Sequence, residues 1–133
     1  MALGTLTGYK LKIIGLPLDH TYVASSDGKA WPCFGRCVGG MPVCFGVGNI
    51  NQAACLAQED GKAGIKYGRT GVCHQAANRI LSVLPEFVSS ADGYNVSVFK
   101  WGAYGLAPGT SREYSPAHYP WPELLACMNH SHP

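Results

Sequence analysis

The sequence predicts a single α+β domain, and three observations lead to that prediction. Strand-like patterns fill the N-terminal third, two helical patterns occupy the middle, and one further strand pattern follows them. The chain has 133 residues, including 17 glycines and 9 prolines, so it is long enough for one core and rich in turns. We therefore expect a small antiparallel sheet packed on a central helix, in one domain over residues 1–133.

Strand patterns come first along the chain. Residues 9–14 alternate apolar side chains with lysines, which is the period of a half-buried strand. Residues 20–25 are rich in β-forming types and are followed by Asp27-Gly28, a strong hairpin signal. The return strand is expected at 29–34, and Pro32 places it at an edge or a bulge.

A loop-rich, cysteine-containing region is expected at 33–48. Its glycines favour an irregular loop over 35–48, held by disulfides. Asn49 then has the position of a helix N-cap, and Gln52 stands three residues on, as in a capping box. The helix that follows carries one apolar face and is expected to end at Asp60-Gly61.

The central helix is predicted from Val72 to about Leu84, between a glycine turn at Gly71 and Pro85. Cys73 stands in its first turn, where the backbone N–H groups and the helix dipole favour thiolate over thiol. Helical spacing puts Cys73 on the same face as four apolar residues. These are Ala77, Ile80, Leu81 and Leu84.

The C-terminal part predicts fewer elements. Residues 94–101 form a clear strand pattern, residues 121–128 suit a short helix, and residues 129–133 are expected to be a flexible tail. Composition excludes some functions. A net charge of +2 without a Lys/Arg run gives no support for nucleic-acid binding, and no apolar run is long enough to span a membrane.

A cysteine nucleophile needs a base, and His20 is the best-placed histidine. His74 is adjacent to Cys73 on the helix, so the two side chains point about 100° apart. His20 alternates with Tyr22, and we expect their face of the sheet to be covered by a helix. The other histidines, at 118, 130 and 132, lie in segments without a clear pattern. The hypothesis is therefore a Cys73–His20 dyad for acyl transfer.

A third group that orients the imidazole is expected, with Asp27 and Gln75 as candidates. Cys44, in its glycine-rich loop, remains open as a second candidate for the nucleophile. We expect no cofactor and no metal, because no C-x-x-C pair and no zinc-type histidine spacing is present. The cysteines that could act as zinc ligands are those at 33, 37 and 44.

Other interpretations of the same residues stay open. Six cysteines indicate disulfides and an oxidising compartment, so Cys73 could be half of a disulfide. His20 could be an ordinary structural histidine. The chain would then be a disulfide-stapled secreted module that binds cell wall or glycan without catalysis. The aromatic residues available for such a groove are Trp31, Trp101 and Tyr104.

Two segments carry a resemblance to a known family: Asp-His-Thr-Tyr-Val at 19–23, and Thr-Gly-Val-Cys-His-Gln-Ala-Ala-Asn-Arg at 70–79. With histidine before cysteine, the chain resembles the permuted branch of the NlpC/P60 papain-like cysteine amidases. More narrowly, it resembles the second family of type VI secretion amidase effectors and their domesticated copies in ticks and other arthropods.

The resemblance implies a papain-like fold and an antibacterial peptidoglycan amidase or endopeptidase. Such proteins cut D,D cross-links between D-alanine and the side-chain amine of a diamino acid. The nucleophile would be Cys73 and the base His20. We expect bacterial peptidoglycan as the partner of a monomer that is secreted or delivered to the bacterial periplasm. An immunity or inhibitor protein is a further partner that the sequence leaves open.

Overall fold

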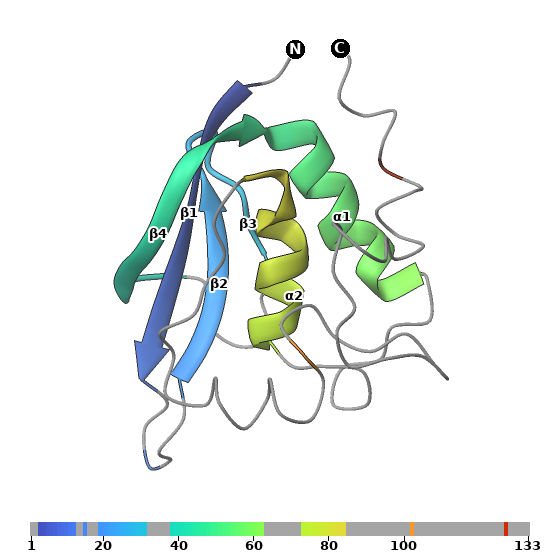
Figure 1. Cartoon of the computed structure of the whole chain (residues 1–133). Coiled ribbons are helices and arrows are strands. Elements are labelled where there is room, and N and C mark those ends of the chain that lie inside the picture. The colour runs from blue at the N-terminus through green and yellow to red at the C-terminus, as the bar shows by residue number, and fades with distance from the viewer. Residues whose placement is uncertain are drawn as a thin grey trace.

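The computed structural model describes residues 3–12, 15, 19–31, 38–62, 73–84, 102 and 127. Within them, a four-stranded sheet forms one layer and two α-helices form a second layer on one of its faces (Figure 1). The elements are β1 (Leu3–Lys12), β2 (Asp19–Ser25), β3 (Ala30–Trp31), β4 (Met41–Asn49), α1 (Ile50–Lys62), α2 (Cys73–Ile80) and the 3-10 turn η1 (Leu81–Val83). The predicted α+β class with a small antiparallel sheet is confirmed.

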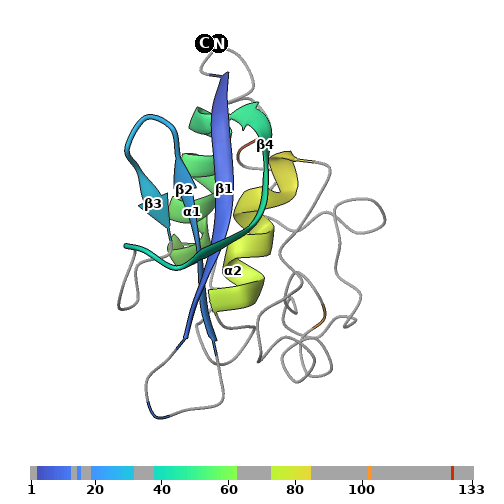
Figure 2. The ribbon, with the colours of Figure 1, turned by 90° about the vertical axis from the view of Figure 1, so that its left-hand side faces the viewer.

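The strand order is β3-β2-β1-β4, and each neighbouring pair is antiparallel (Figure 2). Between β1 and β4 the register shifts: Gly8 pairs with Cys44, but Tyr9 pairs with Pro42. One additional residue of β4 is accommodated there, as in a β-bulge. A proline fits beside such an irregularity because its missing N–H costs the ladder little.

The predicted hairpin is confirmed between β2 and β3. Gly28 adopts a φ of +94°, which glycine tolerates without steric cost, and the Ser25 N–H donates to the Lys29 carbonyl at 2.8 Å. Strand β3 lies at the sheet edge, as Pro32 predicted. The remainder of the expected return strand, 32–34, lies outside the described residues.

The prediction of an irregular loop over 35–48 is wrong for its second half, because residues 41–49 form strand β4. The two glycines within β4, Gly46 and Gly48, are explained by packing. A Cβ on Gly48 would lie 2.9 Å from Leu84 Cδ2 and 3.1 Å from Val83 Cγ2. Glycine in β4 therefore lets the helical layer approach the sheet closely. In the sequence alone, glycines that serve this packing cannot be told apart from glycines of a loop.

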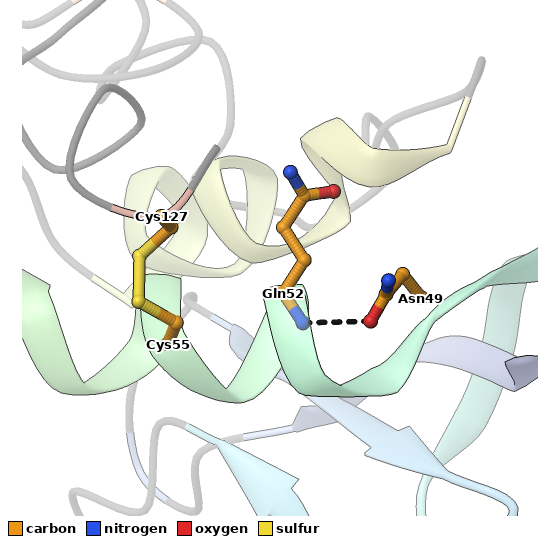
Figure 3. Close-up of a disulfide and its surroundings, with 4 residues drawn as sticks. All are labelled: Asn49, Gln52, Cys55 and Cys127. Atoms are coloured by element: carbon orange, nitrogen blue, oxygen red, sulfur yellow. Dashed lines mark hydrogen bonds between the residues drawn. A yellow bond between two sulfur atoms is a disulfide. The ribbon is translucent and has the colours of Figure 1, made fainter. Parts of the chain in front are cut away.

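Helix α1 begins where the sequence predicts. The Gln52 N–H donates to Asn49 Oδ1 at 3.0 Å, which is the expected N-cap contact (Figure 3). The helix extends to Lys62, slightly beyond Asp60-Gly61. On α1, Cys55 forms a disulfide with Cys127, 72 positions away (Figure 3). This bridge ties the helical layer to the C-terminal part of the chain.

Helix α2 ends at Ile80, and the 3-10 turn η1 continues the predicted helix to Val83. The predicted apolar face is present, because Ala77, Ile80, Leu81 and Leu84 all join the core cluster. The cluster is completed by residues from the sheet and α1, namely Leu6, Val23, Ile50 and Ala53. An amphipathic helix usually leaves its polar face in solvent, but every residue of α2 after Cys73 is buried. The buried polar residues are His74, Gln75, Asn78 and Arg79.

Several predictions lie outside the described residues. They concern the strand at 94–101, the helix over 121–128 apart from Cys127, the tail at 129–133 and the cysteines at 33 and 37. Among the helices that the structure describes, none is both long and apolar enough to cross a membrane.

Candidate active site

Cys73 and His20 lie in contact. His20 Nδ1 is 3.0 Å from Cys73 Sγ, within hydrogen-bond distance for sulfur, although 53 positions separate the residues. Cys73 is the first residue of α2, and His20 is the second residue of β2. The start of α2, the start of β2 and the end of β1 meet at the lower end of the molecule in Figure 1. The two residues that the sequence singles out therefore come together.

The surroundings of Cys73 favour its anionic form. The thiol stands at the N-terminal end of an eight-residue helix whose first turn contains no acidic residue. Its side chain is half-buried, and it is not part of a disulfide. The contacting imidazole is 6% exposed, so solvent screens the interaction weakly. Together these features suit a thiolate–imidazolium pair.

A second contact runs parallel to the first. Thr21 Oγ1 lies 3.2 Å from His74 Nδ1, and this pair is also 53 positions apart. Two consecutive residues of β2 thus contact two consecutive residues of α2. Both Thr21 and His74 are buried, at 0% and 4% exposure. The pair of contacts holds the first turn of α2 against the start of β2.

The expected orientation of β2 needs a correction. Val23 belongs to the core cluster shared with α2, so alternation along the strand puts Thr21 and Val23 on the helix-covered face. His20 and Tyr22 lie on the opposite face. His20 still reaches Cys73 because α2 begins beside the start of β2, where neighbouring side chains from both faces of the strand contact the first turn of the helix.

An aromatic stack lies against His20. The rings of His20 and Tyr22 are 6.0 Å apart, centroid to centroid, with an interplanar angle of 17°. Tyr22 also stacks on Tyr9 of β1 at 5.2 Å and 16°. The Tyr22 hydroxyl donates a hydrogen bond to the Gly39 carbonyl at 2.7 Å. Burial, and secondarily the neighbouring Tyr9, raise the pKa of Tyr22 above its usual value, so its phenol stays protonated.

The contacts described for the two candidates for the third group, Gln75 and Asp27, are with residues other than His20. The Gln75 side-chain amide donates to the Gly102 carbonyl at 3.0 Å, in a buried position. Asp27 lies in the β2–β3 turn, at the end of β2 opposite His20. There it accepts a hydrogen bond from Ser25 Oγ and pairs with Lys29 at 3.6 Å. Asp27 is thus a hairpin residue.

Cys44 is not brought to the dyad. It is a half-buried thiol on β4, opposite Gly8, with β1 lying between its strand and β2. Trp31, one of the aromatics considered for a groove, packs partly buried against the core. The other groove candidates, at 101 and 104, and the histidines at 118, 130 and 132 lie outside the described residues.

A cavity of about 330 Å³ opens at the same end of the sheet as the dyad. Its wall includes Asp19, which precedes His20, and Leu11, which pairs with His20 across the strands. Lys10 and Lys12 give the wall a cationic character, and Lys10 Nζ lies 4.0 Å from Asp19 Oδ2. Among the described side chains, no three His, Cys, Asp or Glu residues gather as a metal-binding group.

Sequence reasoning missed two parts of the site: the Thr21–His74 contact and the role of Tyr22 as a stacking neighbour. The signal for Tyr22 was present, because residues two apart on a strand share a face. The contact of Thr21 was missed because the sequence prediction placed His20, and not Thr21, on the helix-covered face of β2. Comparison with known proteins adds no assignment: the chain matches no family model, no curated protein and no solved structure.

Proposed function

We propose that this protein is a cysteine-dependent amidase that hydrolyses amide bonds in the stem peptides of bacterial peptidoglycan. The observation that carries the proposal is the 3.0 Å contact between His20 Nδ1 and Cys73 Sγ at the N-terminus of α2. A thiol beside an imidazole at a helix start is the arrangement that nucleophilic acyl transfer requires. Cys73 is assigned as nucleophile and His20 as base.

The reaction begins with attack of the Cys73 thiolate on the amide carbonyl carbon. The oxyanion that forms is stabilised by the N-terminal N–H groups of α2. The C–N bond then breaks, the His20 imidazolium donates its proton to the departing amine, and an acyl-thioester remains on Cys73. Neutral His20 next removes a proton from water, and the resulting hydroxide attacks the thioester. The acid is released, and the thiolate–imidazolium pair is restored.

The architecture supports the finer family proposal. The base lies on a strand of an antiparallel sheet and precedes the helix-borne thiol in the chain. This is the order of the permuted NlpC/P60 papain-like enzymes that the segments 19–23 and 70–79 resemble. We extend the proposal to the specificity of the type VI amidase effectors, which is cleavage of D,D cross-links with antibacterial effect.

The cationic cavity beside the dyad supports a peptidoglycan substrate. Stem peptides carry carboxylates, and Lys10 and Lys12 line the cavity on either side of Leu11, the cross-strand neighbour of His20. Attraction between ammonium and carboxylate groups would orient such a peptide at the site. A peptidoglycan substrate implies action outside the cytoplasm, after secretion or in the bacterial periplasm. The Cys55–Cys127 disulfide is typical of such oxidising compartments.

The thiol state of Cys73 favours the enzyme over the alternative of a binding module stapled by disulfides, in which Cys73 would be bridged. The test is digestion of purified sacculi by the wild-type protein and by Cys73→Ala, followed by mass spectrometry of the released muropeptides. The wild type should convert cross-linked dimers to monomers, and Cys73→Ala should leave them intact while folding normally. Equal digestion by both proteins would rule out Cys73 as the nucleophile. Failure of the wild type to cleave any sacculus would reject the proposed substrate.

A further inference from the structure

We propose that Tyr22 is a positioning residue for His20, whose ring it holds in plane and whose imidazolium form it stabilises. The inference rests on the proposed function in one respect: it takes the Cys73–His20 pair as the reactive pair. It goes beyond that function by assigning the orientation of the imidazole to an aromatic stack.

The stack with Tyr22 restrains the tilt of the His20 ring, which the contact with Cys73 does not fix by itself. The contact between Nδ1 and Cys73 Sγ fixes the position of one atom of the imidazole, and a restraint on the plane of the ring must come from a different contact. The Tyr22 ring lies nearly parallel to the imidazole, at 17° and 6.0 Å between centroids, in an offset stack. Tilting the imidazole would break this packing, so the stack defines the ring plane.

Tyr22 is itself held on both sides. Its hydroxyl donates to the Gly39 carbonyl at 2.7 Å, and its ring stacks on Tyr9, its cross-strand neighbour on β1. The residue is only 3% exposed. Tyr22 is therefore a fixed surface against which His20 rests, and the order of contacts runs from β1 through Tyr22 to the imidazole.

The stack also has an electrostatic effect. The face of an aromatic ring is negative and attracts a cation within about 6 Å of its centroid. When the proton of Cys73 moves to His20, the cation forms beside that ring. Tyr22 thus favours the thiolate–imidazolium pair over the neutral pair. The effect on the reactivity of Cys73 is greatest at low pH, where little thiolate would otherwise be present.

Other groups around His20 also influence this equilibrium, so the test compares variants at one position only. Besides Tyr22, the titratable groups near His20 in the described part of the chain are Cys73 and His74 on α2, Tyr9, Lys10 and Lys12 on β1, and Asp19 on β2. Substitutions at Tyr22 leave all the others in place.

The test measures alkylation of Cys73 by iodoacetamide from pH 4.5 to 9 in the wild type, Tyr22→Leu and Tyr22→Phe. Peptide mapping separates Cys73 from Cys44, which is also a thiol. At pH 6 we expect Tyr22→Leu to react about two- to fivefold more slowly, because a cation–π contact of this kind is lost. The half-maximal pH should move upward, and the rate at pH 9 should stay unchanged. Tyr22→Phe keeps the ring and should retain the wild-type profile.

The outcomes are distinct. A purely structural role would lower the melting temperature of Tyr22→Leu without moving the pH profile, and that result would overturn the proposal. So would a shift of equal size in Tyr22→Phe. If Tyr22→Leu does not fold, NMR on the wild type gives the answer through cross-peaks between the two rings, whose absence would reject the stack. None of these readouts uses a wall substrate, so a wild type that fails to cleave sacculi would leave the Tyr22 result intact.

Discussion

His20 Nδ1 lies 3.0 Å from Cys73 Sγ, and the two residues belong to different layers of the fold. We predict that His20→Ala lowers amide hydrolysis about 10²- to 10⁴-fold, the usual contribution of a general base. The measurement is the rate of muropeptide dimer cleavage under single-turnover conditions. His118→Ala is the control and should retain activity, since the base is assigned to His20. Full activity of His20→Ala would remove it from the mechanism.

The Thr21–His74 contact predicts a coupled loss of stability and activity. Thr21→Val keeps the shape of the side chain but removes the oxygen that lies 3.2 Å from His74 Nδ1. We expect the free energy of unfolding to fall by about 1–3 kcal/mol, because the buried His74 Nδ1 loses the oxygen that it contacts. Activity should fall as well, because the contact between Thr21 and His74 helps to hold the first turn of α2, and with it Cys73, against β2. Thr7→Val is the control. Thr7 lies on the face of β1 that the helices do not cover, so this substitution should change neither stability nor activity appreciably.

Glycine at position 40 should be indispensable for a local steric reason. Gly40 has a φ of +94°, and a Cβ there would lie 2.5 Å from the Lys10 carbonyl oxygen. Gly28 has the same φ, but a Cβ added to it would meet nothing within 4 Å. We expect Gly28→Ala to cost about 1–2 kcal/mol, the penalty for a left-handed residue. Gly40→Ala should cost about 1–3 kcal/mol more through overpacking. Urea unfolding gives both values, and equal costs would contradict the clash.

The Cys55–Cys127 disulfide predicts a stability effect separate from catalysis. Its sequence separation of 72 implies a loss of about 4 kcal/mol when both cysteines are replaced by alanine. Cys44→Ser removes a thiol that is not in a disulfide and should cost less. Where the double variant is folded, Cys73 alkylation should match the wild type, because the bridge lies on α1 rather than at the dyad. A double variant as stable as Cys44→Ser would contradict the prediction.

Tyr22 should give the fold a dependence on alkaline pH. Burial, and then the neighbouring Tyr9, raise the pKa of Tyr22 in the folded state above its value of about 10 in the unfolded chain. The folded state therefore holds the phenolic proton more tightly. The resulting stability is fully present below pH 10 and is lost as the pH rises through the folded pKa.

The comparison of melting temperatures for the wild type and Tyr22→Phe between pH 8 and 11 isolates this effect. The wild type should lose stability relative to the variant above pH 10, because only the wild type can ionise at this position. Absorbance at 295 nm reports phenolate formation in parallel. A difference in melting temperature between the two proteins that stays constant from pH 8 to 11 would contradict a raised pKa for Tyr22.

Local elements of the fold could be predicted from residues close together in the chain. The Asp27-Gly28 turn and the Asn49 cap depend on contacts within a few residues, and the apolar face of α2 depends on the spacing of nearby residues; all three are confirmed. Strand β4 could not be predicted in this way. Its glycines have loop character by themselves, and only the proximity of Val83 and Leu84 explains them.

The candidate site also combines features that are local in sequence with features that depend on tertiary contacts. Turn and periodicity signals are local, so they are enough to place a thiol at the start of a helix and a histidine at the start of a strand. Two contacts appear only once the layers pack: His20 on Cys73 from the face opposite the core, and Thr21 on His74. The Tyr22–His20 stack is local, because residues two apart on one strand share a face. The two contacts between the layers depend on where α2 begins relative to the start of β2, and that position is set by core packing between residues far apart in the chain.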